Sequence, residues 1–476
     1  MTIWDERIEA TRTEFVEKLE RRGWRLVSDS ELESQVVVGG STHAVRVQLD
    51  SHFPFAPPRV FPLSELPMSW HRELDGAMCL YPEDGRGSLP WLDVDDLVAT
   101  VERWLEATEQ GWPADAPDMD LERYFQPIGE SFLVVYGEAI EPLMNRMVRF
   151  NVRGPQILLA GSGVKPRKVT QRRHRLYGYV ADIGEPEGPP RDWEELAQLL
   201  GHEARSTLER EVRRGAVDLL LVRYSRKGAV GAIALFVGQD SNEVTLRSVP
   251  SASNSAATLE LRAGRDALSL AEKRVLVVGA GAIGSFVCDY LVRSGLGHLT
   301  VRDPDVLRPG NSVRHLVPSH FAGHRKAIAI KRLLDGRPGT VTQIDVDVRA
   351  LRRADEVPEL LAEFDLIIDA TADGAASAML ADAARTLGSH IISASLQDEG
   401  RIVRADVIPP VEGEAVPAIE FEISGDDLVF EAGCGDPVSM TPPYAANEAA
   451  SLACRLAVQL LLRPSSAGAG EARAYT

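Results

Sequence analysis

Helical and strand-like spacings of apolar residues alternate along the N-terminal quarter of the chain. Residues 3–22 place apolar side chains at helical spacing with charges between them, and Gly23 ends the pattern, so this segment predicts an amphipathic helix. Residues 36–38 and 44–49 alternate apolar with polar positions around a glycine-rich turn, which predicts two strands. The stretch HFPFAPPRVFP, residues 52–62, favours an extended course because its prolines exclude a helix.

A second helical pattern follows at residues 94–106 (VDDLVATVERWLE). The order of helix, antiparallel strands, extended segment and helix indicates an α+β module, which we assign to residues 1–118. Its last stretch, residues 111–118 (GWPADAPD), reads as a loop or linker because of its prolines and small polar residues.

The middle of the chain has strand-like segments and no chemical motif. Residues 156–160, 218–224 and 229–236 are apolar runs that predict strands, and residues 184–190 (GEPEGPP) predict a loop. We assign residues 119–258 to a mixed middle domain, a structural spacer whose fold the pattern does not specify.

A buried strand followed by a glycine-rich turn begins the C-terminal part. Residues 274–278 (RVLVV) stop at three glycines, and a helical segment then leads to a second apolar strand that ends at Asp303. Such glycines permit a tight turn and bring backbone N–H groups close to a phosphate at the start of a helix. An acidic residue at the end of the second strand is placed to bind a ribose hydroxyl. The three glycines are Gly279, Gly281 and Gly284.

Composition narrows the possible classes of protein. The chain has 476 residues, which suggests about three domains, and its 44% hydrophobic and 26% charged residues are typical of globular proteins. A net charge of −18 without a basic run argues against a nucleic-acid partner. No apolar stretch has the roughly 18 residues of a membrane span, and the acidic N-terminal residues do not resemble a signal peptide. We therefore expect a cytoplasmic protein without membrane or nucleic-acid partners.

Polar residues after Asp303 change the interpretation of the glycine turn. A dehydrogenase has no need of Arg314 and Lys326 over a dinucleotide that the glycines already hold, whereas a site that cleaves a triphosphate needs such cations. Asn311 belongs to the same group. These residues disfavour a nicotinamide oxidoreductase.

The segment LTVRDPDVLRPGNSVRH, with the later GHRKA, resembles the adenylation domain of ubiquitin-activating enzymes and of the ThiF- and MoeB-like bacterial enzymes that charge sulfur-carrier proteins. The resemblance implies a Rossmann-like adenylation domain, assigned to residues 259–463, that uses ATP and Mg²⁺. It implies that Asp303 holds the ATP ribose and that Asn311, Arg314 and Lys326 contact the phosphates. The matching residues are Asp303, Asp305, Asn311, Arg314, Gly323 and Lys326.

Two further sites follow from the same resemblance. The run FDLIIDATAD matches the family's Asp-x-Thr-Asp with its last carboxylate one position late, so Asp373 is the candidate Mg²⁺ ligand and Asp369 its substitute; the alternative is that one of them caps the next helix. Arg262 and Arg265 resemble an arginine-bearing N-terminal helix that reaches the ATP of a partner subunit. We choose Arg265 for this role and expect a homodimer, with an ordinary surface arginine as the alternative.

The frame around Cys79 resembles ubiquitin-conjugating enzymes, which carry a thioester on a cysteine. The resemblance covers about residues 1–112 and implies that Cys79 is a nucleophile. The family has His-Pro-Asn where this chain has His71-Arg-Glu73, and an ionised glutamate cannot donate to an oxyanion. The source of oxyanion stabilisation is therefore open, and an inactive binding relative is the alternative. The matching residues are Pro54, Pro57, Pro58, His71, Gly76, Cys79, Leu80 and Trp91.

The remaining cysteines divide into two kinds. Cys434 lies in a glycine-rich loop (AGCGDP) before a helical segment, and in relatives such a loop cysteine accepts the acyl group from the adenylate; a structural thiol is the alternative. Cys288 and Cys454 fall within apolar helical patterns and are expected in the core. With four cysteines and no CxxC pair, a zinc site built from cysteine is disfavoured. The final residues, 464–476, are small and polar and are expected to be a disordered tail.

These resemblances combine into one functional hypothesis. The domain order matches the conjugating–activating fusion ligases of CBASS anti-phage systems and related bacterial ubiquitin-like pathways. It implies ATP-dependent activation of a protein's flexible C-terminus, transfer to Cys434 and then Cys79 as thioesters, and ligation to an unidentified amine. The activated protein would be a cGAS-like nucleotidyltransferase or a ubiquitin-like protein. The alternatives are a sulfur-carrier adenylyltransferase and a non-catalytic scaffold that binds ubiquitin-like folds.

Overall fold

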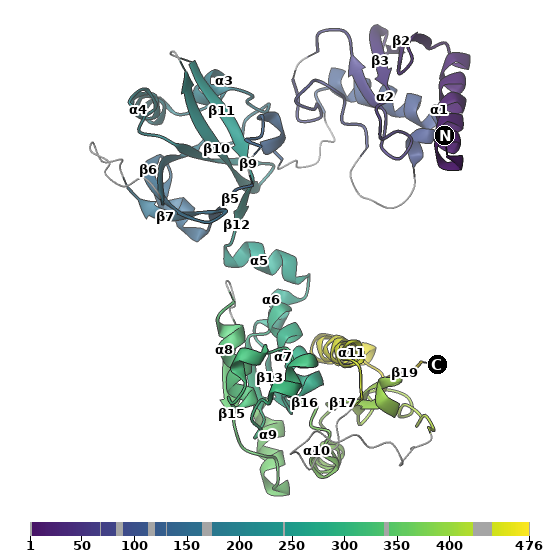
Figure 1. Cartoon of the computed structure of the whole chain (residues 1–476), viewed down its shortest axis with the longest axis vertical. Coiled ribbons are helices and arrows are strands. Elements are labelled where there is room, and N and C mark those ends of the chain that lie inside the picture. Colours follow the sequence, from purple (N-terminus) through teal and green to yellow (C-terminus); the bar gives the residue numbers. More distant parts are fainter. Residues whose placement is uncertain are drawn as a thin grey trace. The chain divides into compact units, whose positions relative to one another are not determined.

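The computed structural model shows two compact units, which comprise residues 1–253 and 254–476 (Figure 1). The structure describes residues 2–66, 68–81, 89–112, 120–129, 131–163, 174–240, 243–337, 342–421 and 440–475.

The first unit begins with an α+β module. Helix α1 (Ile3–Arg21) starts at Thr2, which forms a capping box with Asp5, and α2 (Val94–Glu109) starts at the N-cap Asp93. The two helices and one face of a four-stranded antiparallel sheet bury a shared apolar core. The strands lie in sequence order: β1 (Arg25–Ser28), β2 (Glu31–Val38), β3 (Ser41–Gln48) and β4 (Arg59–Pro62).

The second part of this unit is built around an eight-stranded mixed sheet with the order β11-β10-β9-β8-β6-β7-β5-β12. Helices α3 (Trp193–Gln198) and α4 (His202–Arg213) contribute to the core on one face, and a separate apolar cluster covers the other. The expected strands at 156–160, 218–224 and 229–236 are confirmed as β7, β9 and β10. The strands are β5 (Leu133–Tyr136), β6 (Arg146–Arg153), β7 (Gln156–Ser162), β8 (Arg175–Asp182), β9 (Leu219–Arg226), β10 (Ala229–Asp240), β11 (Glu243–Val249) and β12 (Ser251–Ser253).

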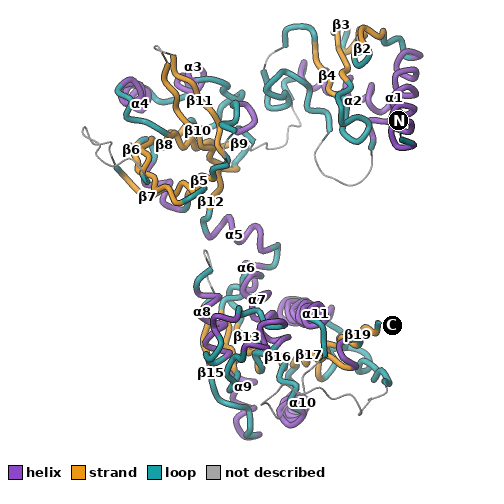
Figure 2. Tube along the Cα trace, viewed as in Figure 1, coloured by secondary structure: helices purple, strands orange, loops and turns teal. Residues whose placement is uncertain are grey.

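The second unit contains a seven-stranded sheet with the order β15-β14-β13-β16-β17-β18-β19. The first five strands in this order are parallel, and the last two join antiparallel, so the fold is a doubly wound α/β arrangement with an antiparallel edge. The strands are drawn in orange in Figure 2. They are β13 (Arg274–Val278), β14 (His298–Arg302), β15 (Gln343–Asp347), β16 (Leu366–Asp369), β17 (Ile391–Gln397), β18 (Ile402–Ile408) and β19 (Gly470–Ala474).

Helices cover both faces of this sheet. Val275 and Val277 of β13 face a core shared with α7, α8 and α11, whereas Leu276 and Val278 face a core shared with α9 and α10. Side chains along a strand alternate between the two faces, so a strand buried on both sides is apolar throughout. The helices are α7 (Ala282–Arg293), α8 (Lys326–Asp335), α9 (Val357–Glu363), α10 (Gly374–Leu387) and α11 (Pro443–Leu462).

The C-terminal residues are more ordered than the sequence predicted. Residues 464–476 were expected to be disordered, but the described residues of this segment, 464–475, include a short 3-10 turn at Pro464–Ser466 and strand β19. β19 pairs antiparallel with β18 over five residue pairs, and Tyr475 donates its N–H to the Arg401 carbonyl at 2.9 Å. A small, polar sequence is a strand here because the neighbouring sheet edge supplies its backbone partners.

None of the helices that the structure describes combines the length and apolar character needed to cross a membrane.

Candidate functional site: a nucleotide edge and a loop cysteine

The glycine turn between β13 and α7 has two crowded positions and one open position. A Cβ added at Gly284 would lie 1.8 Å from the Gly279 carbonyl oxygen, and one added at Gly279 would lie 2.5 Å from the Ala370 carbonyl oxygen. Gly279 also has a φ of +91°, which favours glycine. A Cβ at Gly281 would meet no atom of the described residues within 4 Å. Gly279 and Gly284 are therefore needed to form the turn, whereas Gly281 faces space that a ligand can occupy.

The carboxyl ends of three parallel strands bring the predicted nucleotide residues to one edge of the sheet. Gly279 follows β13, Asp303 follows β14, and Asp369 ends β16. Gly279 donates its N–H to the Arg302 carbonyl at 2.8 Å, and Ala370 donates to the Val278 carbonyl at 2.8 Å. Ligands of open α/β sheets bind outside the carboxyl ends of the strands, so this edge is suited to a nucleotide.

Asp303 is 5% exposed and is held by two backbone N–H groups. Its Oδ2 accepts from Ala280 at 2.6 Å, and its Oδ1 accepts from Asp305 at 2.7 Å. Each carboxylate oxygen can accept a further hydrogen bond. The carboxylate therefore stabilises the glycine turn and keeps acceptor capacity for a hydroxyl group.

His315 holds the other side of the same peptide and was missed by sequence reasoning. Its Nε2 lies 2.7 Å from the Ala280 carbonyl oxygen, and its Nδ1 accepts from the Val317 N–H at 3.0 Å. Because a carbonyl only accepts and an N–H only donates, the ring must be neutral with its proton on Nε2. The adjacent Leu316 donates to the buried Ser285 hydroxyl at 3.2 Å. A histidine directly after the Asn-x-x-Arg pattern was the available signal.

Burial lowers the pKa of His315, with a smaller contribution from the positive charge of Lys326. The unfolded chain takes up a proton near the ordinary value of 6.5, where the folded chain does not, so stability falls as the pH drops below that value. We expect the melting temperature of the wild type to fall more than that of His315→Gln between pH 7.5 and pH 5.5, measured by thermal unfolding. Equal losses in the two proteins would contradict this assignment.

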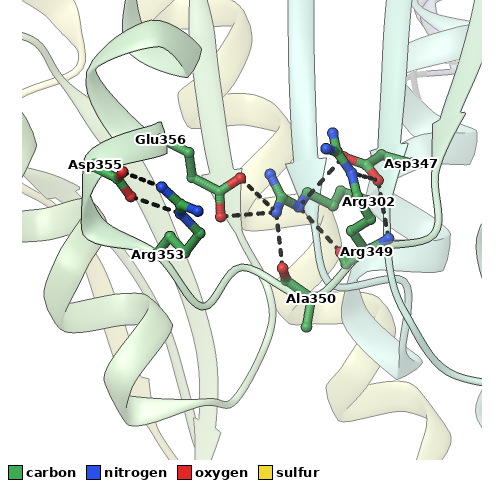
Figure 3. A network of polar contacts seen from close by, with 7 residues as sticks. All are labelled: Arg302, Asp347, Arg349, Ala350, Arg353, Asp355 and Glu356. Atoms are coloured by element: carbon green, nitrogen blue, oxygen red, sulfur yellow. Dashed lines mark hydrogen bonds and ion pairs between the residues drawn. The ribbon is translucent and has the colours of Figure 1, made fainter.

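Arg302 holds the loop next to Asp303 at the carboxyl edge of the sheet, and this role was not predicted from the sequence. Its side chain is 2% exposed, and it donates to the carbonyl oxygens of Arg349 and Ala350 at 3.1 and 2.9 Å and to the Glu356 carboxylate at 3.0 Å (Figure 3). Asp347, which also lies close to this guanidinium, accepts from Arg349. Arg302 thereby fixes the loop after β15 beside Asp303. An arginine at the end of an apolar strand is a recognisable signal for such an anchor.

The three polar residues predicted to contact phosphates have partners within the chain. The Asn311 Oδ1 accepts from the Arg308 N–H at 2.9 Å. Arg314 donates to the Thr441 carbonyl at 3.1 Å, just before α11. Lys326, at the start of α8, lies 2.9 Å from Asp305, with 14% of its side chain exposed against 64% for Asp305. The structure thus ties each residue to the loops around the edge.

The two candidate metal ligands differ in how much acceptor capacity they keep. Asp369 is 2% exposed and accepts from the hydroxyls of Thr371, Ser377 and Ser393 and from the Thr371 N–H, so its oxygens are occupied. Asp373 is exposed and caps α10 through Oδ1, which accepts from two backbone N–H groups. The helix-cap alternative thus holds for Asp373, but its Oδ2 has no hydrogen-bond partner among the described residues. Within that same part of the chain, no group of three or more His, Cys, Asp or Glu is placed to hold a metal ion.

Arg265 does not join the nucleotide edge. It is exposed in the turn between α5 (Ala256–Ala263) and α6 (Ala267–Leu270). α6 packs against the residues that precede β14, since the Leu270 carbonyl accepts from Gly297 at 2.9 Å. Those residues lie at the amino ends of the strands, opposite the glycine turn. Within its own unit, Arg265 is therefore at the wrong end of the sheet to contact a nucleotide.

The cysteines separate as expected where the structure describes them. Cys288 and Cys454 are 0% and 7% exposed in α7 and α11. Burial raises the pKa of Cys454 to about 12 and also raises the pKa of Cys288. Their predicted core positions are confirmed. Cys79 is half-buried on a loop. Its N–H donates to the His71 carbonyl at 3.0 Å, and the Trp104 indole donates to the same oxygen at 3.0 Å. Cys434 lies outside the described residues.

Comparisons with known proteins identify the C-terminal part. Residues 254–416 match the ThiF family. The chain is 30% identical over 179 residues to the ATP-dependent ubiquitin transferase-like protein Cap2 of Escherichia coli (strain TW11681), covering 36% of this chain and 30% of that protein. It is 33% identical over 136 residues to the adenylyltransferase and sulfurtransferase MOCS3 of Arabidopsis thaliana, covering 28% and 29%. Each match thus spans less than a third of the relative's length.

Solved structures with similarity to the chain include E. coli tRNA N6-threonylcarbamoyladenosine dehydratase, TcdA, in complex with ATP. That chain has 22% sequence identity and a TM-score of 0.28, with coverage of 31% of this chain and 62% of that one. E. coli MccB has 17% identity and a TM-score of 0.33, with coverage of 43% and 57%. Together with the glycine turn and the ordered polar residues at the sheet edge, the family match identifies residues 254–416 as a ThiF-family domain.

Proposed function

We propose that this protein is an ATP-dependent enzyme that activates the C-terminal carboxylate of a protein substrate and transfers it, through thioesters, to an amine. One observation carries the proposal. The same chain joins a ThiF-family domain, whose glycine turn leaves open space at Gly281, to an α+β module that presents a half-buried cysteine on a loop. A domain that only adenylates has no use for the second module.

The sheet edge supports the first step, acyl-adenylate formation. The substrate carboxylate attacks the α-phosphorus of ATP, the bond to the bridging oxygen breaks, and pyrophosphate leaves. Lys326, Arg314 and Asn311 lie on the loops around the edge and are assigned to the phosphates, where cations offset the charge that develops on the leaving group. Asp303 is assigned to the ribose, because it keeps acceptor capacity beside Ala280. Lys326 would exchange Asp305 for phosphate, a low-cost change since Asp305 is largely exposed.

Mg²⁺ would add positive charge at the phosphates when bound. Asp373 is the better of the two candidate ligands, because its Oδ2 is open whereas the oxygens of Asp369 are held by hydroxyl and N–H donors. Arg265 is assigned to the nucleotide of a second copy of the chain, since its place at the opposite end of the sheet separates it from its own. The proposed active unit is therefore a homodimer.

The later steps use sulfur. A thiolate, assigned to Cys434, attacks the carbonyl of the adenylate and displaces AMP. The Cys79 thiolate then attacks this thioester and releases the first sulfur, and an amine finally displaces Cys79, loses a proton and forms an amide. The module around Cys79 supports this by its resemblance to ubiquitin-conjugating enzymes. The assignment of Cys434 depends on the sequence alone.

The identity of the substrate is proposed at the level of chemistry. Several relatives are named ubiquitin transferase-like, which favours a substrate with a flexible C-terminal tail, a cGAS-like nucleotidyltransferase or a ubiquitin-like protein, in the cytoplasm. The second candidate is a sulfur-carrier adenylyltransferase, which the similarity to MOCS3 supports. Such an enzyme leaves the cysteine of the N-terminal module without a role.

Replacing Cys79 with alanine separates these two candidates. The variant should retain exchange of pyrophosphate into ATP in the presence of the substrate protein. It should form no amide product, because only the thiol that carries the last thioester is lost. Non-reducing mass analysis should find the acyl group on Cys434. Cys288→Ala, which removes a buried core thiol, is the control that should keep the transfer. Full amide formation by Cys79→Ala would overturn the proposed transfer through Cys79. Absence of pyrophosphate exchange in the wild type would overturn the proposed adenylation step.

A further inference from the structure

Trp70 belongs by sequence to the N-terminal α+β module, but its side chain is buried outside the core of that module. It is 2% exposed, and the apolar cluster of the N-terminal α+β module does not include it. Its ring belongs to the cluster of the eight-stranded middle domain, against which Met68 also packs. Since both residues precede the loop of Cys79, this segment leaves its own module and inserts into the neighbouring domain.

The middle domain surrounds the Trp70 ring with aromatic and cationic groups. Tyr224 of β9 stacks on it at 6.2 Å between centroids and 13° between planes. Tyr124 meets it edge-on at 5.9 Å and 87°. The Arg226 guanidinium carbon lies 4.5 Å from the ring centroid, and Arg226 is itself 6% exposed. Aromatic pairs and a desolvated cation over an indole are each favourable beyond simple burial.

The Trp70 backbone is held as well as its ring. The Tyr124 hydroxyl donates to the Trp70 carbonyl at 2.9 Å, and the Arg123 guanidinium donates to the same oxygen. The pocket itself is tied together, because the Leu121 N–H donates to the Tyr224 hydroxyl at 3.2 Å. A segment held through both ring and carbonyl has little freedom to move relative to the middle domain.

The residue after Trp70 connects this anchor directly to the candidate nucleophile. The His71 carbonyl accepts from the Cys79 N–H at 3.0 Å, and Arg72 pairs with Met78 as an isolated antiparallel bridge. Arg72 also closes the loop by donating to the carbonyl oxygens of Leu66 and Gly76 at 3.0 and 3.1 Å. Residues 71–79 thus form one hydrogen-bonded loop whose first residue adjoins the Trp70 anchor.

We propose that the middle domain is a clamp on the Cys79 loop, and that Trp70 is the positioning residue through which it sets the geometry and reactivity of Cys79. This gives a role to a domain in which the sequence offers no chemistry. The effect on amide formation rests on the proposed function. The effect on the loop does not, because loop order and thiol reactivity can be measured without any substrate.

The test compares Trp70→Ala with Trp70→Phe in the full chain. Phenylalanine keeps an aromatic ring in the pocket but is smaller than indole, and the indole N–H that is lost is buried without a hydrogen-bond partner among the described residues, so Trp70→Phe should change the loop much less than Trp70→Ala. Trp70→Ala empties the pocket and should release the loop. We expect amide hydrogen exchange over residues 71–80 to become about tenfold faster, and alkylation of Cys79 by iodoacetamide, followed by peptide mass analysis, to accelerate several-fold. Pyrophosphate exchange by the ThiF-family domain should stay unchanged.

Tyr124→Phe is the second variant and decides the matter if Trp70→Ala does not fold. It removes a hydroxyl that donates to the Trp70 carbonyl and leaves the aromatic packing in place, so a smaller change in the same direction is expected. Wild-type exchange and alkylation rates in Tyr124→Phe, and in Trp70→Ala if that variant folds, would overturn the clamp. Altered rates in a protein that forms no thioester would support the clamp and refute the proposed function, so the two can fail separately.

Discussion

Replacing Lys326 with alanine should lower pyrophosphate exchange by about 10²–10³-fold, because one cation that neutralises the leaving group is lost. The fold should survive, since the partner Asp305 is 64% exposed and can be solvated once Lys326 is gone. The measurement is the rate of labelled pyrophosphate exchange into ATP with the substrate protein present, beside a thermal unfolding curve of each variant.

Arg332→Ala is the matched control for this change. Arg332 is an exposed cation of the same helix, α8, and its removal changes the net charge by the same amount. If the loss came from the general electrostatic field, both variants would show it. We expect the Arg332 variant to exchange at the wild-type rate, and equal losses in the two variants would remove Lys326 from the proposed phosphate site.

Alanine at Gly284 should lower the stability of the fold, whereas alanine at Gly281 should weaken ATP binding and leave the stability unchanged. The new Cβ at Gly284 would lie 1.8 Å from the Gly279 carbonyl oxygen, so the turn and α7 must separate. We expect the free energy of unfolding to fall by about 3 kcal/mol or more, measured by urea denaturation. At Gly281 the Cβ meets no atom within 4 Å in the part of the chain that the structure describes, and φ is −82°, so the unliganded protein should unfold like the wild type.

The Gly281 variant should instead bind ATP more weakly by about tenfold or more, because its methyl group enters the space where a phosphate approaches the start of α7. Titration calorimetry with ATP gives this value directly. Normal ATP affinity in Gly281→Ala would place the nucleotide elsewhere on the sheet edge. Normal stability in Gly284→Ala would contradict the expected clash between the new Cβ and the Gly279 carbonyl oxygen.

Several elements of the fold could be predicted because their evidence is local. The helix over residues 3–22 corresponds to α1, and the strand at 274–278 corresponds to β13. The burial of Cys288 and Cys454 also followed from apolar spacing. In each case the periodicity of a short segment reports which side faces the core, so no distant partner has to be known.

Elements whose partners lie far away in the chain were not accessible in this way. β1 is exposed at every residue and is a strand because it pairs antiparallel with β2. β19 is small and polar, and it becomes a strand because the edge of β18 is available to it. The order of strands in the middle domain likewise depends on pairings between segments that are distant in sequence.

The residues of the candidate site also fall into those that local sequence predicts and those that depend on distant partners. The sequence by itself determined the chemical inventory: the glycines, Asp303, the ordered polar residues, Cys79 and Cys434, since residue types and spacings are carried in the local chain. Only the tertiary structure decided that His315 and Arg302 hold the nucleotide edge, that Asp369 is occupied by its neighbours, and that Trp70 binds the middle domain. Those assignments depend on which donor meets which acceptor across distant segments, and a linear pattern does not contain that information.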